Sequence, residues 1–180
     1  MGVTKLHQAD QSLFDKEGLC YWACEFMTTF KGDRVQGAWA DWQRSTYAQL
    51  REAGISFTAY QACYVWAKVQ RGNEQTPLDQ YAPVQGALAP NRLFRIAVYV
   101  GPSPQPSSGP NHEIMCVTGP GTRVLVFDAN LGFYETHADD MPGKNNREAM
   151  EHELKALLYG DTPAGTIYDF HYRNIGPIRA

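Results

Sequence analysis

The sequence predicts an α+β fold in which several helices come first and an antiparallel β-sheet follows. Apolar residues recur at helical spacing in the first 72 residues, whereas β-branched and aromatic runs dominate residues 93–137. Only short links separate these runs, and short links join antiparallel rather than parallel strands. The chain has 180 residues with 43% hydrophobic content, so we expect one globular domain that covers residues 1–180.

Three helices are expected in the first part of the chain. They cover residues 19–31, a segment from Trp39 to Leu50 that is closed by Gly54, and residues 58–72. Thr58 is the expected cap of the third helix. Residues 73–92 carry three prolines and should be irregular.

The second part should hold the sheet and one further helix. The expected strands are residues 93–100, 111–119, 122–130, 132–137 and 165–175, and the expected helix covers residues 146–160. Gly119, Pro120 and Gly121 should form the turn between the second and third strands. The segment 101–110 holds four prolines and two glycines, so it should be a loop.

Charge and composition exclude several classes of function. The formal net charge is -3, so the chain lacks the basic excess that is typical of nucleic-acid-binding proteins. No apolar run approaches the roughly 18 residues of a membrane span. The first ten residues lack the apolar stretch of a secretory signal peptide. Four cysteines are too few for a disulfide scaffold, so we expect reduced thiols.

Two cysteines lie four residues apart at the start of the first expected helix. Cys20 and Cys24 fit two zinc ligands, two buried core thiols, or a catalytic thiol with an inert neighbour. No second Cys/His pair with zinc-site spacing follows, so no metal is expected. Cys20 should lie in the first helical turn, where unpaired N–H groups and the helix dipole favour a thiolate. Cys24, Cys63 and Cys116 better fit buried, inert thiols.

A histidine and an aspartate at strand ends supply the groups that a catalytic thiol needs. His112 opens the second expected strand, and Asp128 lies near the end of the third. Each is separated from the hairpin turn by nearly the same number of residues, so the hairpin should bring them opposite each other. A histidine held by a carboxylate can serve as a general base for a nucleophile. Asn130 should share a strand face with Asp128, so the sequence pattern leaves it open as the alternative partner of His112.

These residues resemble the motifs of the YopT-type cysteine proteases, a family of the papain-like group. The resemblance lies in "GLC", in His112 at a strand start, and in "VFDANLGFYE", and it spans about residues 18–135. It implies a papain-like fold, in which N-terminal helices, including the nucleophile helix, pack on a C-terminal antiparallel sheet. It also implies that Cys20 is the nucleophile, His112 the general base and acid, and Asp128 the residue that orients His112. No cofactor is expected.

The segment before Cys20 departs from the family pattern. Papain-like enzymes place an Asn or Gln shortly before the cysteine, where it helps to form the oxyanion hole. Here Phe14 and Asp15 occupy the near positions, and Gln11 is the closest amide. Gln11 and Asp15 are therefore the side-chain candidates for the oxyanion hole, and the backbone N–H of Cys20 is the safer donor.

The resemblance implies a thiol hydrolase that cleaves an amide bond of a protein substrate. The first expectation is a cysteine endopeptidase that acts as a secreted bacterial effector or toxin. The alternatives are a protein-glutamine deamidase with the same triad and an inactive binding module that kept the fold. Expected partners are a protein substrate and an immunity or chaperone protein. Specialised secretion into a target cell is expected, with a cytoplasmic enzyme as the alternative.

Overall fold

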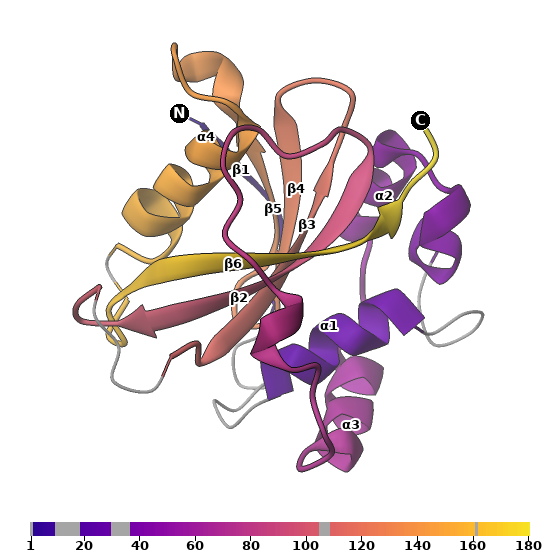
Figure 1. Ribbon diagram of the computed structural model, residues 1–180. Helices are drawn as coiled ribbons and strands as arrows, with labels where there is room; N and C mark the ends of the chain where they lie inside the picture. The colour runs from indigo at the N-terminus through magenta and orange to yellow at the C-terminus, as the bar shows by residue number, and fades with distance from the viewer. Residues whose placement is uncertain (1, 10–18, 30–36, 105–108, 161) are drawn as a thin grey trace.

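A six-stranded antiparallel sheet forms the centre of the molecule, and helices cover both of its faces (Figure 1). The computed structural model describes residues 2–9, 19–29, 37–104, 109–160 and 162–180. Within this part of the chain, the predicted α+β class and the antiparallel pairing of the sheet are confirmed.

The sheet has the strand order β1-β5-β4-β3-β2-β6. Its strands are β1 (Val3–Gln8), β2 (Arg92–Gly101), β3 (His112–Thr118), β4 (Arg123–Asp128), β5 (Gly132–His137) and β6 (Thr166–Pro177). Strands β2 to β6 match the five predicted strands to within a few residues. The sequence analysis missed β1, which lies at the edge of the sheet and pairs with β5 through a register shift between Lys5 and His7. Its alternation of buried and exposed residues is weak, because an edge strand packs little of its surface.

Four helices form the layer on one face of the sheet. They are α1 (Leu19–Thr29), the 3-10 helix η3 (Gly37–Arg44), α2 (Tyr47–Ile55) and α3 (Tyr60–Gln70). The expected single helix from Trp39 to Gly54 is wrong, because Thr46 starts a new helix. Its side chain accepts the N–H of Gln49, and the Gln49 side chain accepts the N–H of Thr46. Thr58 is not the N-cap of α3 either, since that position is Ala59.

Gly54 does not end α2 but lies inside it. A Cβ atom at this position would come within 3.0 Å of the Phe133 ring on β5. The glycine therefore allows α2 to pack closely against the sheet. The sequence analysis interpreted Gly54 as a helix end instead of a packing position.

A single long helix covers the other face of the sheet. It begins as α4 (Asn146–Glu153), capped reciprocally by Asn145 and Glu148, and continues as the π-helical turn η6 (Leu154–Leu158). The predicted helix 146–160 is thus present, but its last turn is wider than an α-helical turn. The segment expected to be irregular holds one short 3-10 turn, η4 (Leu78–Gln80), and another, η5 (Ala138–Asp140), follows β5.

Two hydrophobic clusters hold the layers together, one on each face of the sheet. The cluster under α1, α2 and α3 includes Phe26, Leu50, Phe57, Phe127 and Phe133. The cluster under α4 and η6 includes Phe94, Ile96, Ile114, Val126 and Met150. Strands β3 and β4 are therefore buried on both faces. Full burial of a Leu, Ile or Phe side chain contributes about 1.5–3 kcal/mol, so these clusters fix the strand ends that carry the candidate site.

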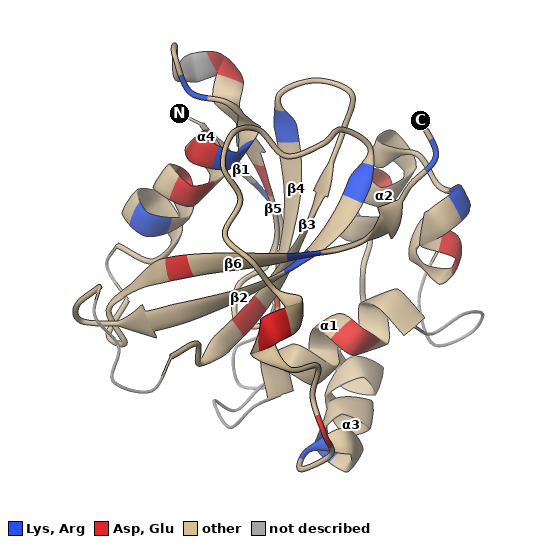
Figure 2. Ribbon diagram, in the orientation of Figure 1, with Lys and Arg blue, Asp and Glu red and all other residues tan. Residues whose placement is uncertain are grey.

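Charged residues of both signs are interspersed over the fold (Figure 2). Among the described helices, none is both long and apolar enough to cross a bilayer.

Candidate active site

His112 and Asp128 form a buried pair at one end of the sheet. His112 is the first residue of β3 and Asp128 is the last residue of β4. The His112 Nε2 atom lies 3.1 Å from Asp128 Oδ1 and 3.0 Å from Oδ2. The β3–β4 register pairs Met115 with Phe127, which places Asp128 beside Ile114. The two side chains are therefore diagonal neighbours on one face of the sheet. The sequence had predicted that they lie directly opposite each other.

Cys20 reaches this pair from the helical layer. It is the second residue of α1, it is partly exposed, it lines a surface pocket together with His112, and its sulfur helps to raise the pKa of the His112 imidazole. Since Nε2 of His112 faces Asp128, Nδ1 is the ring nitrogen left for the sulfur. The structure thus brings together all three residues of the expected triad, from α1, β3 and β4.

The other three cysteines are buried in the hydrophobic clusters. Burial raises the pKa values of the Cys24, Cys63 and Cys116 thiols well above the usual range. A thiol that stays protonated is a poor nucleophile and a poor metal ligand. Cys20 differs from them by its partial exposure and its contact with an imidazole.

The surroundings of His112 favour its protonated form. Burial alone would lower the pKa of His112, but the Asp128 carboxylate and the Cys20 sulfur outweigh burial and hold the pKa well above its ordinary value. An imidazolium between a carboxylate and a sulfur stabilises the thiolate on its other side. The site therefore sets a protonated imidazole beside the Cys20 sulfur, which is the arrangement that a cysteine nucleophile and its general acid require.

Asn130 supports Asp128 and does not take its place. It lies in the turn between β4 and β5, so the expectation that it continues the strand face of Asp128 is wrong. Its backbone N–H donates to Asp128 Oδ1 at 2.9 Å.

Tyr159 completes the surroundings of the pair and was missed by the sequence analysis. Its hydroxyl group donates a short hydrogen bond to Asp128 Oδ2 and lies 3.1 Å from His112 Nε2. Tyr159 follows Asp128 by 31 positions and lies just after η6, so no motif spacing connects the two residues.

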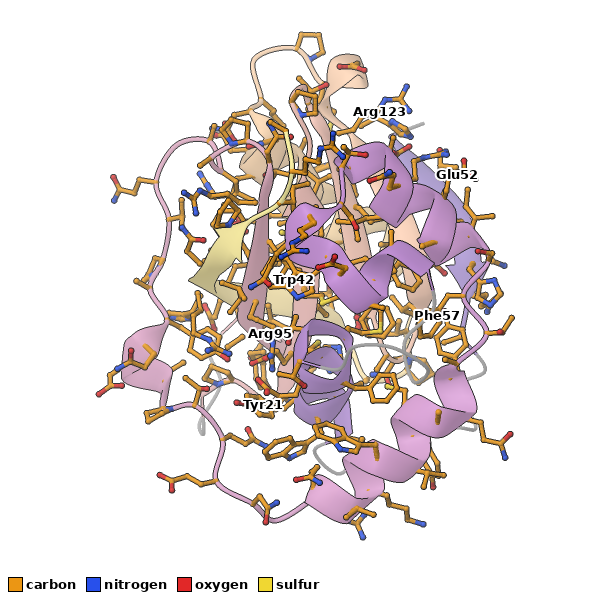
Figure 3. The ribbon with its side chains drawn as sticks, turned by 90° about the vertical axis from the view of Figure 1, so that its right-hand side faces the viewer. Tyr21, Trp42, Glu52, Phe57, Arg95 and Arg123 are labelled. Atoms are coloured by element: carbon orange, nitrogen blue, oxygen red, sulfur yellow. The ribbon has the colours of Figure 1, made fainter. Side chains whose placement is uncertain are left out.

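A buried arginine, Arg95, links the helical layer to the sheet, and Figure 3 shows it next to Tyr21 of α1. Arg95, on β2, has no exposed surface. Its guanidinium group donates to Glu25 Oε1 at 2.7 Å, to the Tyr21 carbonyl at 3.0 Å, and to Glu113 Oε2. It also lies 4.7 Å from the centre of the Tyr21 ring. The only sequence signal for this link is a charged residue in the middle of the apolar run "LFRIAVYV".

The positions of these contacts matter for the triad. Tyr21 follows Cys20 in α1, and Glu113 follows His112 in β3. Arg95 therefore binds Tyr21 and Glu113 at the same time, and these two residues directly follow Cys20 and His112 in the chain. If either contact of this buried arginine broke, no water could replace the lost hydrogen-bond partner. The contacts therefore hold α1 and β3 in a fixed position relative to each other.

A surface pocket of about 440 Å³ opens beside Cys20 and His112. Its walls come from the region around η4, the start of β3, and α1; they include Gln75, Leu78, Tyr81, Pro110 and Asn111. Pro110 and Asn111, at the end of the predicted loop, form part of one wall, whereas residues 105–108 of that loop lie outside the described part of the chain. The reactive groups are thus accessible from a pocket large enough for several side chains.

Of the candidates for the oxyanion hole, the structure describes only the backbone N–H of Cys20. Gln11 and Asp15 lie outside the described residues. The backbone N–H of Cys20 belongs to the first turn of α1, where N–H groups have no partner within the helix. It can therefore donate to a negative oxygen that forms next to the sulfur.

In the described segments, no group of three or more His, Cys, Asp or Glu side chains is arranged to bind a metal ion. Cys24, the second cysteine of the zinc alternative, instead directs its Sγ to the carbonyl of Glu113 at 3.8 Å.

No protein-family model, curated protein or solved structure matches this chain. Its activity must therefore be inferred from the chemistry of its own residues.

Proposed function

We propose that this protein is a papain-like cysteine hydrolase that cleaves an amide bond of a protein substrate, acting as an endopeptidase. A single observation supports this most strongly: the His112 ring, held by the Asp128 carboxylate, lies with Cys20 on the wall of one pocket, where the Cys20 sulfur helps to raise the pKa of His112. This is the arrangement of a nucleophile, a general base and an orienting acid.

In the proposed reaction, the Cys20 thiolate attacks the carbonyl carbon of the substrate amide. The negative oxygen that forms is stabilised by N–H groups at the start of α1, an interaction worth roughly 3–4 kcal/mol per donor in other enzymes. Protonated His112 gives its proton to the leaving nitrogen, and the C–N bond breaks to leave a thioester on Cys20. Neutral His112 then takes a proton from water, whose oxygen displaces the sulfur and releases the acid.

Asp128 would act through His112 in both steps. Its two oxygens hold Nε2, so Nδ1 keeps facing the sulfur, and its charge stabilises the imidazolium. The papain-like assignment draws further support from the placement of the nucleophile at the start of a helix packed on an antiparallel sheet.

Mass spectrometry of candidate target proteins would test the proposed activity. If the protein is an endopeptidase, the wild type should cut a target protein into fragments, and a Cys20→Ser variant should leave that target intact. An intact target that gains only an amide-to-acid mass change would instead identify a glutamine deamidase, which uses the same groups.

Alkylation by iodoacetamide at mildly acidic pH tests the site without a known substrate. We expect Cys20 to be labelled before the three buried thiols and more slowly in a His112→Ala variant. Equal labelling of Cys20 in both proteins would indicate an inactive binding module. Loss of activity in Cys24→Ala but not in Cys20→Ala would show that the wrong thiol has been chosen.

The proposed biological role is that of a secreted effector or toxin delivered into a target cell, with an immunity or chaperone protein as its partner. It follows from the motif resemblance alone, so a search for cleaved proteins in exposed cells is its direct test.

A further inference from the structure

We infer that Tyr159 is a positioning residue that fixes the Asp128 carboxylate and limits how strongly it attracts the proton of His112. This inference rests on the hydrolase function proposed above and adds a fourth side chain to its triad. Tyr159 is absent from the residues that line the pocket, so it would act through Asp128 and not on the substrate.

The geometry around Asp128 supports this role. Its Oδ1 accepts the N–H of Asn130 at 2.9 Å, and its Oδ2 accepts the hydroxyl of Tyr159. His112 Nε2 lies between the two oxygens at 3.1 and 3.0 Å. One donor on each oxygen, from two different elements, leaves the carboxylate a single orientation.

The π-helical turn gives a second, independent argument. The N–H of Tyr159 donates to the carbonyl of Leu154 at 2.9 Å, which is a hydrogen bond between residues five apart. In an α-helix, residues five apart point about 140° away from each other around the axis. Here both Leu154 and Tyr159 are buried in the cluster on this face of the sheet. The wider turn is therefore what directs Tyr159 to the triad, and such turns are frequent at functional sites.

The titratable groups that interact electrostatically with the pair come from three parts of the fold. They are Cys20 and Cys24 on α1, Tyr134 on β5, and Tyr159 after η6. Burial and the Asp128 charge raise the pKa of Tyr159 well above its ordinary value, so its hydroxyl keeps its proton and remains a donor.

The chemical consequence has a definite sign. A hydrogen bond to a carboxylate disperses its charge and makes it less basic. Without the Tyr159 hydroxyl, Asp128 would attract the proton on Nε2 more strongly. The pKa of His112 should then rise further, and His112 would give up its proton less readily in each catalytic cycle.

The test compares Tyr159→Phe with Tyr172→Phe in the full chain. Tyr172 is buried in the same cluster, but its hydroxyl donates to Glu151 at 2.6 Å, away from the triad. We expect NMR titration of the imidazole nitrogens to give an upward shift of the His112 pKa in Tyr159→Phe and no shift in Tyr172→Phe. An unchanged or lowered pKa in Tyr159→Phe, or equal shifts in both variants, would overturn the inference.

A second measurement covers the case in which Tyr159→Phe does not fold. Replacement of Tyr159 by 3-fluorotyrosine keeps the hydroxyl and nearly the same volume but makes it a stronger donor. The pKa of His112 should then fall relative to that of the unmodified protein. No change would again contradict the inference.

Failure of the inference is distinguishable from failure of the proposed function. If iodoacetamide labels Cys20 selectively and depends on His112, but the His112 pKa ignores Tyr159, only the positioning role is wrong. If Cys20 is not labelled selectively, the hydrolase function is wrong, whatever the titration of His112 shows.

Discussion

Replacement of Arg95 by Met should cost about 3–5 kcal/mol of the free energy of unfolding. This is the usual cost of removing one partner from a buried ion pair. In this chain it arises mainly at Glu113, whose side chain is 7% exposed and whose pKa burial already raises, so without Arg95 this carboxyl group would lose its main counter-ion and the hydrogen bond that Arg95 donates to it inside the protein. Glu25 is 21% exposed, so water can replace its lost donor at a smaller cost. A small domain has about 5–15 kcal/mol in total, so the variant should fold but be markedly weakened.

Urea denaturation followed by circular dichroism would measure this cost. The slope of the free energy against urea should stay unchanged, which shows that the same surface is exposed on unfolding. The double variant Arg95→Met/Glu113→Gln is the matched control, because it also removes the stranded carboxylate. It should be less destabilised than the sum of the two single variants by about 1–3 kcal/mol. A loss below about 1 kcal/mol in Arg95→Met, or simple additivity, would refute the reasoning.

Three further substitutions probe the site and the sheet around it. Asp128→Asn should lower the pKa of His112, measured by NMR titration, because the carboxylate raises that pKa in the folded protein. In wild type, the raised pKa stabilises the fold fully below about pH 6.5, and this contribution is lost as the pH rises through the folded-state pKa of His112. An equal decline of stability with pH in Asp128→Asn would contradict this. Gly132→Ala should cost at least about 2 kcal/mol in thermal unfolding, since φ is +105° and the new Cβ would lie 2.1 Å from the His7 carbonyl oxygen; an unchanged melting temperature would disprove the clash. Glu135→Gln should cost about 1–3 kcal/mol in urea denaturation, because this fully buried carboxylate accepts hydrogen bonds from three side chains, and a neutral result would show that they are replaceable.

The parts of the fold that depend on local pattern were predictable from the sequence. β3 and β4 have continuous apolar runs, and the Gly-Pro-Gly turn between them identifies a hairpin. That hairpin was enough to bring His112 and Asp128 together in the prediction, although two residues out of register. The first turn of α1 could also be located, because Gly18 precedes an apolar helical run.

Features that depend on distant partners were not predictable. β1 owes its extended form to pairing with β5, and its own residues carry little strand preference. The break before Thr46 depends on a reciprocal cap between Thr46 and Gln49, which an uninterrupted helical pattern conceals. Tyr159 reaches the triad only because one helical turn is widened, and no residue pattern in the sequence predicts a widened turn.

The candidate site draws its groups from both faces of the sheet. Cys20 comes from the layer of α1, whereas Tyr159 comes from the layer of α4 and η6, and His112 lies 92 positions after Cys20. Partners so far apart in sequence meet late, because closing a long loop costs chain entropy before any contact repays it. A nascent or partly folded chain should therefore have an ordinary, unreactive thiol at position 20. The Cys20 sulfur would meet its imidazole only once α1 has docked on the sheet, and the full set of contacts around Asp128 would form only once η6 has docked as well.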